Sequence, residues 1–108
     1  MTDAVSEMLA AINASDLERF VACYEAHAAI EDGDGRVLAR GHAEIRDRYG
    51  PMFQKFPGLR VQARSPRWTV GPYVVQHEEV VGRDAEAEWH IAVYRVEGGL
   101  IVRELLLR

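Results

Sequence analysis

The sequence predicts an α+β fold in which N-terminal helices pack inside a curved antiparallel sheet to give a cone-shaped domain. Two observations lead to this prediction. Apolar residues recur at helical spacing in the first half, and the second half alternates between apolar and polar residues and is divided by glycine turns. Helices followed by a meander of strands are typical of the α+β class. The length of 108 residues corresponds to one domain, residues 1–108.

Three helices are expected before the long strands. Apolar residues at positions i, i+3, i+4 and i+7 predict a helix over residues 3–13. The second helix is predicted over residues 15–26, with Ser15 as the N-cap of a capping box. The third is predicted over residues 42–55. Because proline lacks the backbone N–H, Gly50-Pro51 predicts a kink or a break within it.

The strands are predicted from alternation and from the turns between them. A short strand at residues 28–30 leads into Glu31-Asp32 and a glycine turn, and another short strand follows around Val37. Pairs of residues that favour turns, such as Gly98-Gly99, then separate four longer strands. Their predicted ranges are 60–70, 73–81, 85–96 and 100–107.

Composition excludes several functional classes. The net charge of −4 argues against nucleic acid as a partner, because phosphate binding requires a basic surface. No run of 18 apolar residues is present, so we expect no membrane span. The N-terminus carries acidic residues and no basic segment, and Cys23 has no second cysteine to pair with, so a cytoplasmic protein is expected. No motif for a metal or an organic cofactor occurs, and we expect neither.

The order of these elements resembles the nuclear-transport-factor-2-like (NTF2-like) superfamily, which includes ketosteroid isomerase and the SnoaL-like polyketide cyclases. The residues that carry the resemblance are Ser15-Asp16, Tyr24, Glu31-Asp32, Gly41 and Tyr49. The resemblance implies a pocket for a hydrophobic small molecule inside the cone. It also implies a homodimer through the outer sheet face.

Asp32 is the residue that the resemblance singles out for catalysis. It matches the general base of ketosteroid isomerase, which also follows a glutamate before a turn. The alternative is that Asp32 only accepts hydrogen bonds from the turn at Gly33–Gly35. The two oxyanion donors of that isomerase would fall near Met8 and Ala92, whose side chains cannot donate a hydrogen bond. Classical steroid isomerase activity is therefore not expected.

The resemblance also assigns faces to the strands. Alignment with the corresponding hairpin of ketosteroid isomerase puts His90 and Ala92 on the pocket face. His77 and His90 then become candidate proton donors. With Glu104 they would form a two-His, one-carboxylate metal set, but no metal-binding spacing supports it. The outer face would carry Trp89, Ile91, Val93, Leu105 and Leu107. The charged residues of Glu78-Glu79 and Arg46–Arg48 are interpreted as solvated surface.

Two functional hypotheses follow from these residues. In the first, the protein is an isomerase, cyclase or hydratase of the SnoaL-like type, with Asp32, His77 and His90 as catalytic residues. In the second, it is a non-catalytic module of the same fold that binds a small ligand or serves for dimerisation. The expected substrate-binding residues are Tyr24, Tyr49, Tyr73, Val75, Ala92, Glu104 and Leu106.

Overall fold

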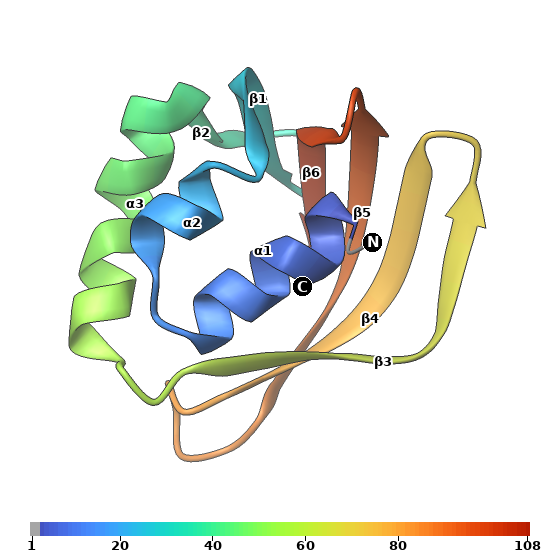
Figure 1. Cartoon of the computed structure of the whole chain (residues 1–108). Coiled ribbons are helices and arrows are strands. Elements are labelled where there is room, and N and C mark those ends of the chain that lie inside the picture. The colour runs from blue at the N-terminus through green and yellow to red at the C-terminus, as the bar shows by residue number, and fades with distance from the viewer. Residues whose placement is uncertain (1–2) are drawn as a thin grey trace.

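Six strands form one curved sheet that wraps around three helices in the computed structural model, which describes residues 3–108 apart from the side chain of Ser65 (Figure 1). In chain order the elements are α1 (Ala4–Asn13), α2 (Leu17–Val21), β1 (Tyr24–Asp32), β2 (Val37–Arg40), α3 (Gly41–Lys55), β3 (Arg60–Val70), β4 (Tyr73–Val81), β5 (Glu88–Glu97) and β6 (Leu100–Leu107). The described helices are all too short or too polar to cross a membrane.

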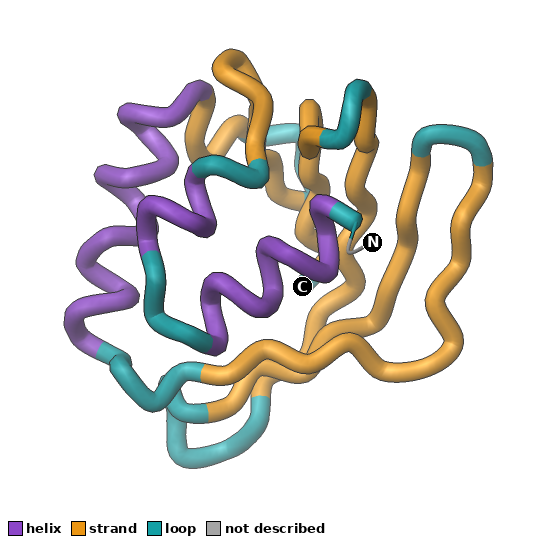
Figure 2. The backbone as a smooth tube through the Cα atoms, in the orientation of Figure 1, coloured by secondary structure: helices purple, strands orange, loops and turns teal. Residues whose placement is uncertain are grey.

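The sheet is mixed rather than wholly antiparallel. Its strand order is β2-β1-β6-β5-β4-β3, and β1 runs parallel to β6 while the other neighbours are antiparallel. The helices occupy the concave side, and β3 and β4 pass beneath α1 before bending away at their turn (Figure 2). The predicted α+β cone is confirmed, with this one parallel pairing added.

Aspartate side chains cap the first two helices. Asp3 accepts a hydrogen bond from the Ser6 N–H at 2.9 Å, and Asp16 accepts one from the Arg19 N–H at 3.1 Å. Each satisfies one backbone donor that the helix leaves free. Ser15 was predicted to be the N-cap of the second helix, and this is wrong: it adopts a positive φ of 55° in the turn before Asp16.

The second helix is much shorter than predicted. It ends at Val21, and Tyr24 begins β1, so the expected helix over residues 15–26 is wrong. The carbonyl of Cys23 accepts a hydrogen bond from the Ile101 N–H at 2.9 Å, and Tyr24 pairs with Ile101 in the sheet. Pairing with β6 outweighs the helical spacing, because it satisfies the backbone and still buries Tyr24.

The third helix continues through its proline. It runs from Gly41 to Lys55 with Pro51 inside, so the predicted break at Gly50-Pro51 is absent. Proline removes the hydrogen bond to the carbonyl four residues earlier, that of Asp47. Both residues are exposed, so water can replace the missing donor. The helix therefore turns one continuous face toward the sheet, with Ile45 and Phe53 buried on it.

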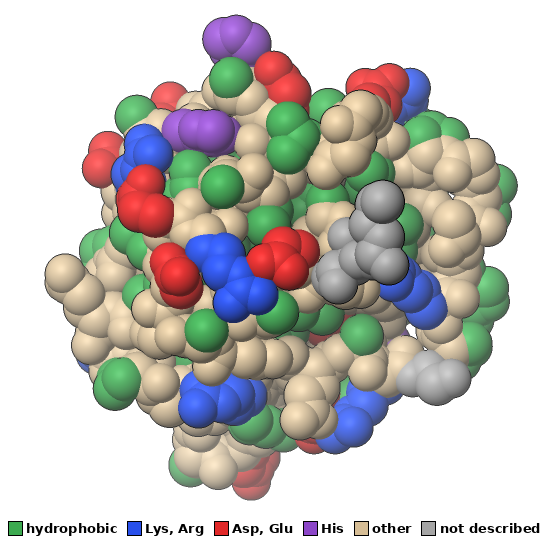
Figure 3. Space-filling model, viewed as in Figure 1, with side chains coloured by type: hydrophobic (Ala, Val, Ile, Leu, Met, Phe, Trp, Pro, Cys, Tyr) green, Lys and Arg blue, Asp and Glu red, His purple; other side chains and the backbone are tan. Residues whose placement is uncertain are grey.

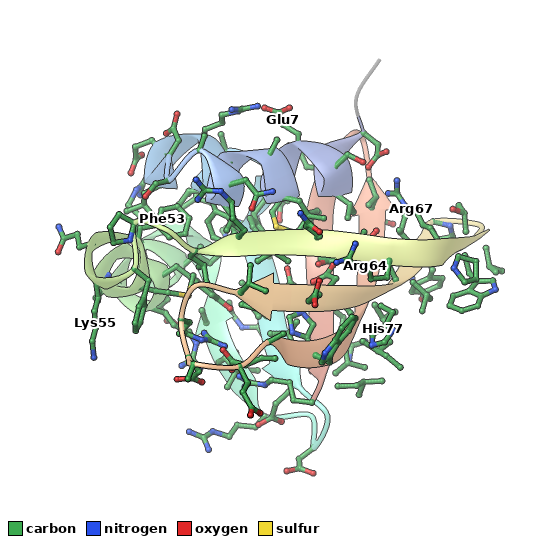
Figure 4. The ribbon with its side chains drawn as sticks, turned by 90° about the horizontal axis from the view of Figure 1, so that it is seen from below. Glu7, Phe53, Lys55, Arg64, Arg67 and His77 are labelled. Atoms are coloured by element: carbon green, nitrogen blue, oxygen red, sulfur yellow. The ribbon has the colours of Figure 1, made fainter. Side chains whose placement is uncertain are left out.

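Residues of β4 alternate between the two faces of the sheet. The inner face carries the buried side chains of Val74, Gln76, Glu78 and Val80. The opposite set does not face the helices, so the predicted pocket-face position is wrong for Tyr73, Val75 and His77. His77 is exposed and packs on the Trp89 ring, with 4.7 Å between ring centroids, on the side of the sheet away from α1 (Figure 4).

The wrong face was predicted for β4 because its register with β5 was shifted by one residue. Glu78 lies directly opposite His90, and opposite residues in a sheet share a face. Even-numbered residues of β4 and β5 therefore point to the same side. The sequence-based assignment combined odd-numbered residues of β4 with even-numbered residues of β5, and such a shift reverses a whole strand. The predicted outer face of β5 and β6 is confirmed: Trp89, Ile91 and Leu107 are exposed, and Val93 and Leu105 are half-buried.

Candidate functional site

A cavity of about 340 Å³ lies between the helices and the inner face of the sheet. This volume is at the small end of the range of roughly 300–1,000 Å³ that is typical of ligand pockets. Its apolar lining is Met8, Leu9, Ile12, Phe20, Leu38, Met52, Phe56, Leu59, Val61, Val80 and Leu106. Its polar lining is Tyr24, Arg48, Tyr49, Glu78, Arg83, His90, Tyr94, Glu104 and Arg108. A mostly apolar pocket with a few converging polar groups is the usual form of a small-molecule site.

Glu104 is a buried carboxyl group in this cavity. Only 5% of the residue is exposed, and the Tyr24 hydroxyl donates to its Oε1 at 2.5 Å. Burial raises the pKa of Glu104 to about 8. The Tyr24 hydrogen bond opposes this rise, and the charge of Glu78 adds to it. At pH 7 such a group is mostly protonated, so it can donate a proton or a hydrogen bond.

Glu78 forms the centre of a second buried network, from β4 to β5. Its Oε1 lies 2.7 Å from Nε2 of His90, and its Oε2 accepts from the Tyr94 hydroxyl at 2.5 Å and from the Gln76 amide at 2.6 Å. The residue is 2% exposed. When the His90 Nε2 carries the proton to Glu78, Nδ1 is left with the lone pair of a base. Carboxylate and imidazole therefore form an oriented dyad at the cavity wall.

Three tyrosines bring neutral hydroxyl groups to the same place. Burial, and after it the charge of Glu104, raises the pKa of Tyr24, Tyr49 and Tyr94 above the ordinary value. Tyr94 lies directly opposite Glu104 in the β5–β6 pair, so the strand register brings the two networks side by side. The tyrosines act as hydrogen-bond donors rather than as proton acceptors.

Arginine side chains complete the lining. Arg83 donates to both carboxylate oxygens of Glu88, each at 2.8 Å, and its Nη1 lies 3.6 Å from the Met52 sulfur. It follows Gly82, which has a φ of +89° and lies so close to Gly58 that a Cβ would stand 2.5 Å from the Gly58 carbonyl oxygen. Glycine is thus required for the turn that brings Arg83 to the cavity.

The structure brings together half of the predicted site residues. Tyr24, Tyr49, His90, Glu104 and Leu106 line the cavity, and Ala92 is fully buried in the row between Gln76 and Leu106 without lining it. Asp32, Tyr73, Val75 and His77 do not line the cavity. Within residues 3–108, no three histidine, cysteine, aspartate or glutamate side chains cluster as metal ligands would, and the proposed set is broken because His77 faces outward.

Asp32 is the last residue of β1, and its side chain faces the following turn instead of lining the cavity. Its Oδ1 accepts hydrogen bonds from the Asp34 N–H at 3.0 Å and the Arg36 N–H at 3.1 Å. The four residues between β1 and β2 leave backbone donors that need an acceptor, and an aspartate before a glycine turn supplies one. This geometry favours the turn-stabilising interpretation of Asp32 over that of a general base.

Sequence reasoning missed Glu78 and the arginines. Glu78 was interpreted as solvated together with Glu79, yet it is almost fully buried. Arg48 was interpreted as solvated surface, and it is exposed but also lines the cavity. A usable signal was present. Apolar residues Val74 and Val80 flank Gln76 and Glu78 at every second position, which marks one inner face that includes both polar residues.

Comparisons with known proteins agree with the fold. The superposed structures include an uncharacterised cystatin-fold protein from Novosphingobium aromaticivorans, with 26% identity, a TM-score of 0.86, and coverage of 97% of this chain and 95% of that one. A putative ketosteroid isomerase from Kribbella flavida has 17% identity and a TM-score of 0.74, with coverage of 96% and 73%. TerC, co-crystallised with polyporic acid, has 18% identity and a TM-score of 0.76, with coverage of 95% and 86%.

The sequence itself also matches a family model. No curated protein matches the chain significantly. The model of the SnoaL-like domain matches residues 5–104, which is nearly the whole chain. The ketosteroid-isomerase-like neighbours share the curved sheet around helices described above. The chain therefore belongs to the SnoaL-like domain family, within the NTF2-like superfamily.

Proposed function

We propose that this protein binds a hydrophobic small molecule in the cavity and catalyses a proton transfer on it, as an isomerase, cyclase or hydratase would. The observation that carries the proposal is the buried Glu104, whose carboxyl group has a pKa of about 8 inside an apolar cavity. Carboxyl groups with strongly shifted pKa values are concentrated at functional sites. TerC, the neighbour crystallised with polyporic acid, adds support for small-molecule binding by this fold.

Glu104 would act as the acid in this reaction. Its protonated form can donate to a carbonyl oxygen of the ligand, and thereby stabilise the negative charge that develops when a neighbouring carbon loses a proton. The Tyr24 hydroxyl already donates to Oε1 and would stabilise the carboxylate after the proton leaves. Among the described residues no donor is bonded to Oε2, so that oxygen is available to the ligand.

His90 would act as the base, in place of Asp32. Its Nδ1 can accept a proton from the ligand carbon, because Glu78 holds Nε2 and stabilises the charged ring that results. Tyr94 and Gln76 hold the Glu78 carboxylate in position. One proton thus moves from carbon to His90 and one from Glu104 to oxygen, so the charges balance within the site.

A non-catalytic ligand-binding module of the same fold is the second candidate. One observation favours it: every fully buried side-chain nitrogen and oxygen in the described part of the chain has a hydrogen-bond partner. A buried polar network with a purely structural role also requires a hydrogen-bond partner for each of its polar atoms. The two candidates differ in whether a bound ketone loses a proton.

Deuterium exchange separates the two candidates. The bicyclic ketone 2-tetralone is incubated with the protein in D2O, and the loss of α-proton signals is followed by NMR. We expect the wild type to accelerate exchange and both Glu104→Gln and His90→Gln to lose about tenfold or more of this acceleration. Asp32→Asn is the matched control and retains it. Binding of 2-tetralone without faster exchange would support the non-catalytic module instead.

The exposed apolar side chains on the outer sheet face favour a homodimer. Trp89, Ile91 and Leu107 are 48%, 43% and 40% exposed, and Trp68 and Val70 on β3 are 52% and 70% exposed. Exposed apolar surface of this kind marks an interaction site, and a flat face can pair with itself around a two-fold axis.

Sedimentation should give a dimer that Ile91→Glu converts to a monomer, because the glutamate would bury an unpaired charge in the interface. Ala43→Glu, a similar change at an exposed position of α3 on the other side of the sheet, should leave the dimer intact, and a wild-type monomer at micromolar concentration contradicts the proposal.

A further inference from the structure

The cavity lining is positively charged although the protein is acidic. The chain carries 13 basic and 17 acidic residues, a net charge of −4. The lining carries three arginines, Arg48, Arg83 and Arg108, against two glutamates, Glu78 and Glu104. On the helical face of the surface, by contrast, charged side chains of both signs are interspersed (Figure 3). The local excess of positive charge therefore belongs to the cavity and not to the surface in general.

Two of these arginines are not engaged by acidic groups of the protein. Arg83 is paired with Glu88. An ion pair requires a nitrogen–oxygen distance of at most 4.0 Å. Among residues 3–108, no carboxylate lies this close to the guanidinium group of Arg48 or Arg108. Both side chains are exposed enough to meet a ligand at the mouth of the cavity. Two arginines without an acidic partner can bind an oxyanion through their planar, fork-shaped donors.

Tyr49 lines the cavity together with these arginines and Glu104. Burial and the charge of Glu104 raise the pKa of Tyr49, whereas the guanidinium groups of Arg48 and Arg108 lower it. All four side chains line the same cavity. Arg108 directly follows β6 and lies four residues after Glu104, which corresponds to roughly 13 Å between their Cα atoms if the chain stays extended. A small ligand can therefore reach both.

We propose that the ligand of this cavity is an organic carboxylate, whose apolar body fills the cavity and whose acidic group is bound by Arg48 and Arg108. The inference rests on the proposed function and adds the chemical class of the ligand. The carboxylate stays at the mouth, where water and two guanidinium groups surround it. The apolar body extends inward, so that the opposite end of the molecule lies at Glu104 and His90.

The carboxylates of the site do not repel this ligand. Glu104 is mostly protonated at neutral pH and so carries little charge. Glu78 accepts hydrogen bonds from Gln76, His90 and Tyr94, which spread its charge over three donors. A cationic ligand would be repelled, because the mouth of the cavity carries Arg48 and Arg108.

A matched pair of probes tests the proposal. 2-Naphthoate and its neutral amide, 2-naphthamide, share the same bicyclic body, and their affinities for the full chain are measured by isothermal titration calorimetry. We expect the naphthoate to bind roughly tenfold more tightly, and the advantage to fall as salt is added. In the double variant Arg48→Gln/Arg108→Gln this advantage should disappear, while the amide binds as before. The control Arg36→Gln/Arg40→Gln changes two exposed arginines outside the cavity and should retain it.

The outcomes separate this inference from the proposed function. Equal binding of both probes, or a naphthoate advantage that survives in the double variant, overturns the carboxylate proposal and leaves a pocket for neutral apolar molecules. If neither probe binds, the proposed pocket function fails, and the carboxylate proposal fails with it. A loss of affinity for both probes in the double variant would show a general effect on the cavity, and also contradicts a specific role of the arginines.

Discussion

Replacing Glu104 by glutamine should remove a large pH dependence from the stability of the protein. The pKa of Glu104 is about 8 in the folded state, against 4.5 for the free side chain. Between these two pH values the folded protein keeps a proton that the unfolded chain has released. Stability therefore falls as the pH rises through this window, by roughly 1.4 kcal/mol per pH unit. Glutamine does not titrate, and its amide oxygen can still accept from Tyr24.

The difference between wild type and variant isolates this contribution, because all other groups titrate in both proteins. From pH 5.5 to pH 7.5 the wild type should lose roughly 2.5 kcal/mol of stability relative to Glu104→Gln. This is slightly less than the full slope of about 1.4 kcal/mol per pH unit gives, because Glu104 begins to release its proton near pH 7.5. Urea denaturation at several pH values measures it. Glu86→Gln, in the exposed loop before β5, should follow the wild-type curve. Parallel curves for wild type and Glu104→Gln would refute the assignment of a buried, protonated Glu104.

Three further substitutions test the remaining contacts. Glu78→Ala should destabilise the protein by about 2–4 kcal/mol in urea denaturation, because the buried Gln76 and Tyr94 and the half-buried His90 lose their acceptor; a loss below about 1 kcal/mol would mean that water enters and replaces it. Gly82→Ala should cost more than about 1 kcal/mol, since the added Cβ would meet the Gly58 carbonyl at a positive φ, and a wild-type melting temperature would contradict that turn. Asp32→Asn should leave 2-naphthoate affinity unchanged in calorimetry, and a clear loss would return Asp32 to the site.

The sequence allowed the fold to be predicted because its signals are local and repeated. The α1 stripe, the glycine turns and the alternation in β5 each specify one element without help from the rest of the chain. Residues 22–26 are compatible with both a helix and a strand, and only the pairing of Tyr24 with Ile101 far along the chain decides between them. Local spacing cannot reveal such a partner, which is why α2 was predicted too long.

The site was harder to predict because it depends on which face each strand turns inward. The resemblance to the ketosteroid isomerase hairpin predicted His90, Glu104 and Leu106 on the pocket face, and all three line the cavity. A short turn joins β5 and β6, so the relation between these two strands is fixed. The connection between β4 and β5 is longer, so the register of these two strands could not be fixed from the sequence to within one residue. Because of this one-residue shift, His77 was predicted on the pocket face in place of Glu78. His77 is an exposed ring, whereas Glu78 is a buried hydrogen-bond acceptor.

The central claim is that small molecules bind in the cavity at Glu104 and His90, and not at the Asp32 turn. An NMR titration of the ¹⁵N-labelled protein with 2-naphthoate tests it most directly, because each backbone amide reports separately. We expect the largest shift changes at residues that line the cavity, among them Tyr49, His90 and Glu104, and no change over residues 32–36. Shift changes confined to residues 32–36 or to the outer face around Trp89 would contradict the claim.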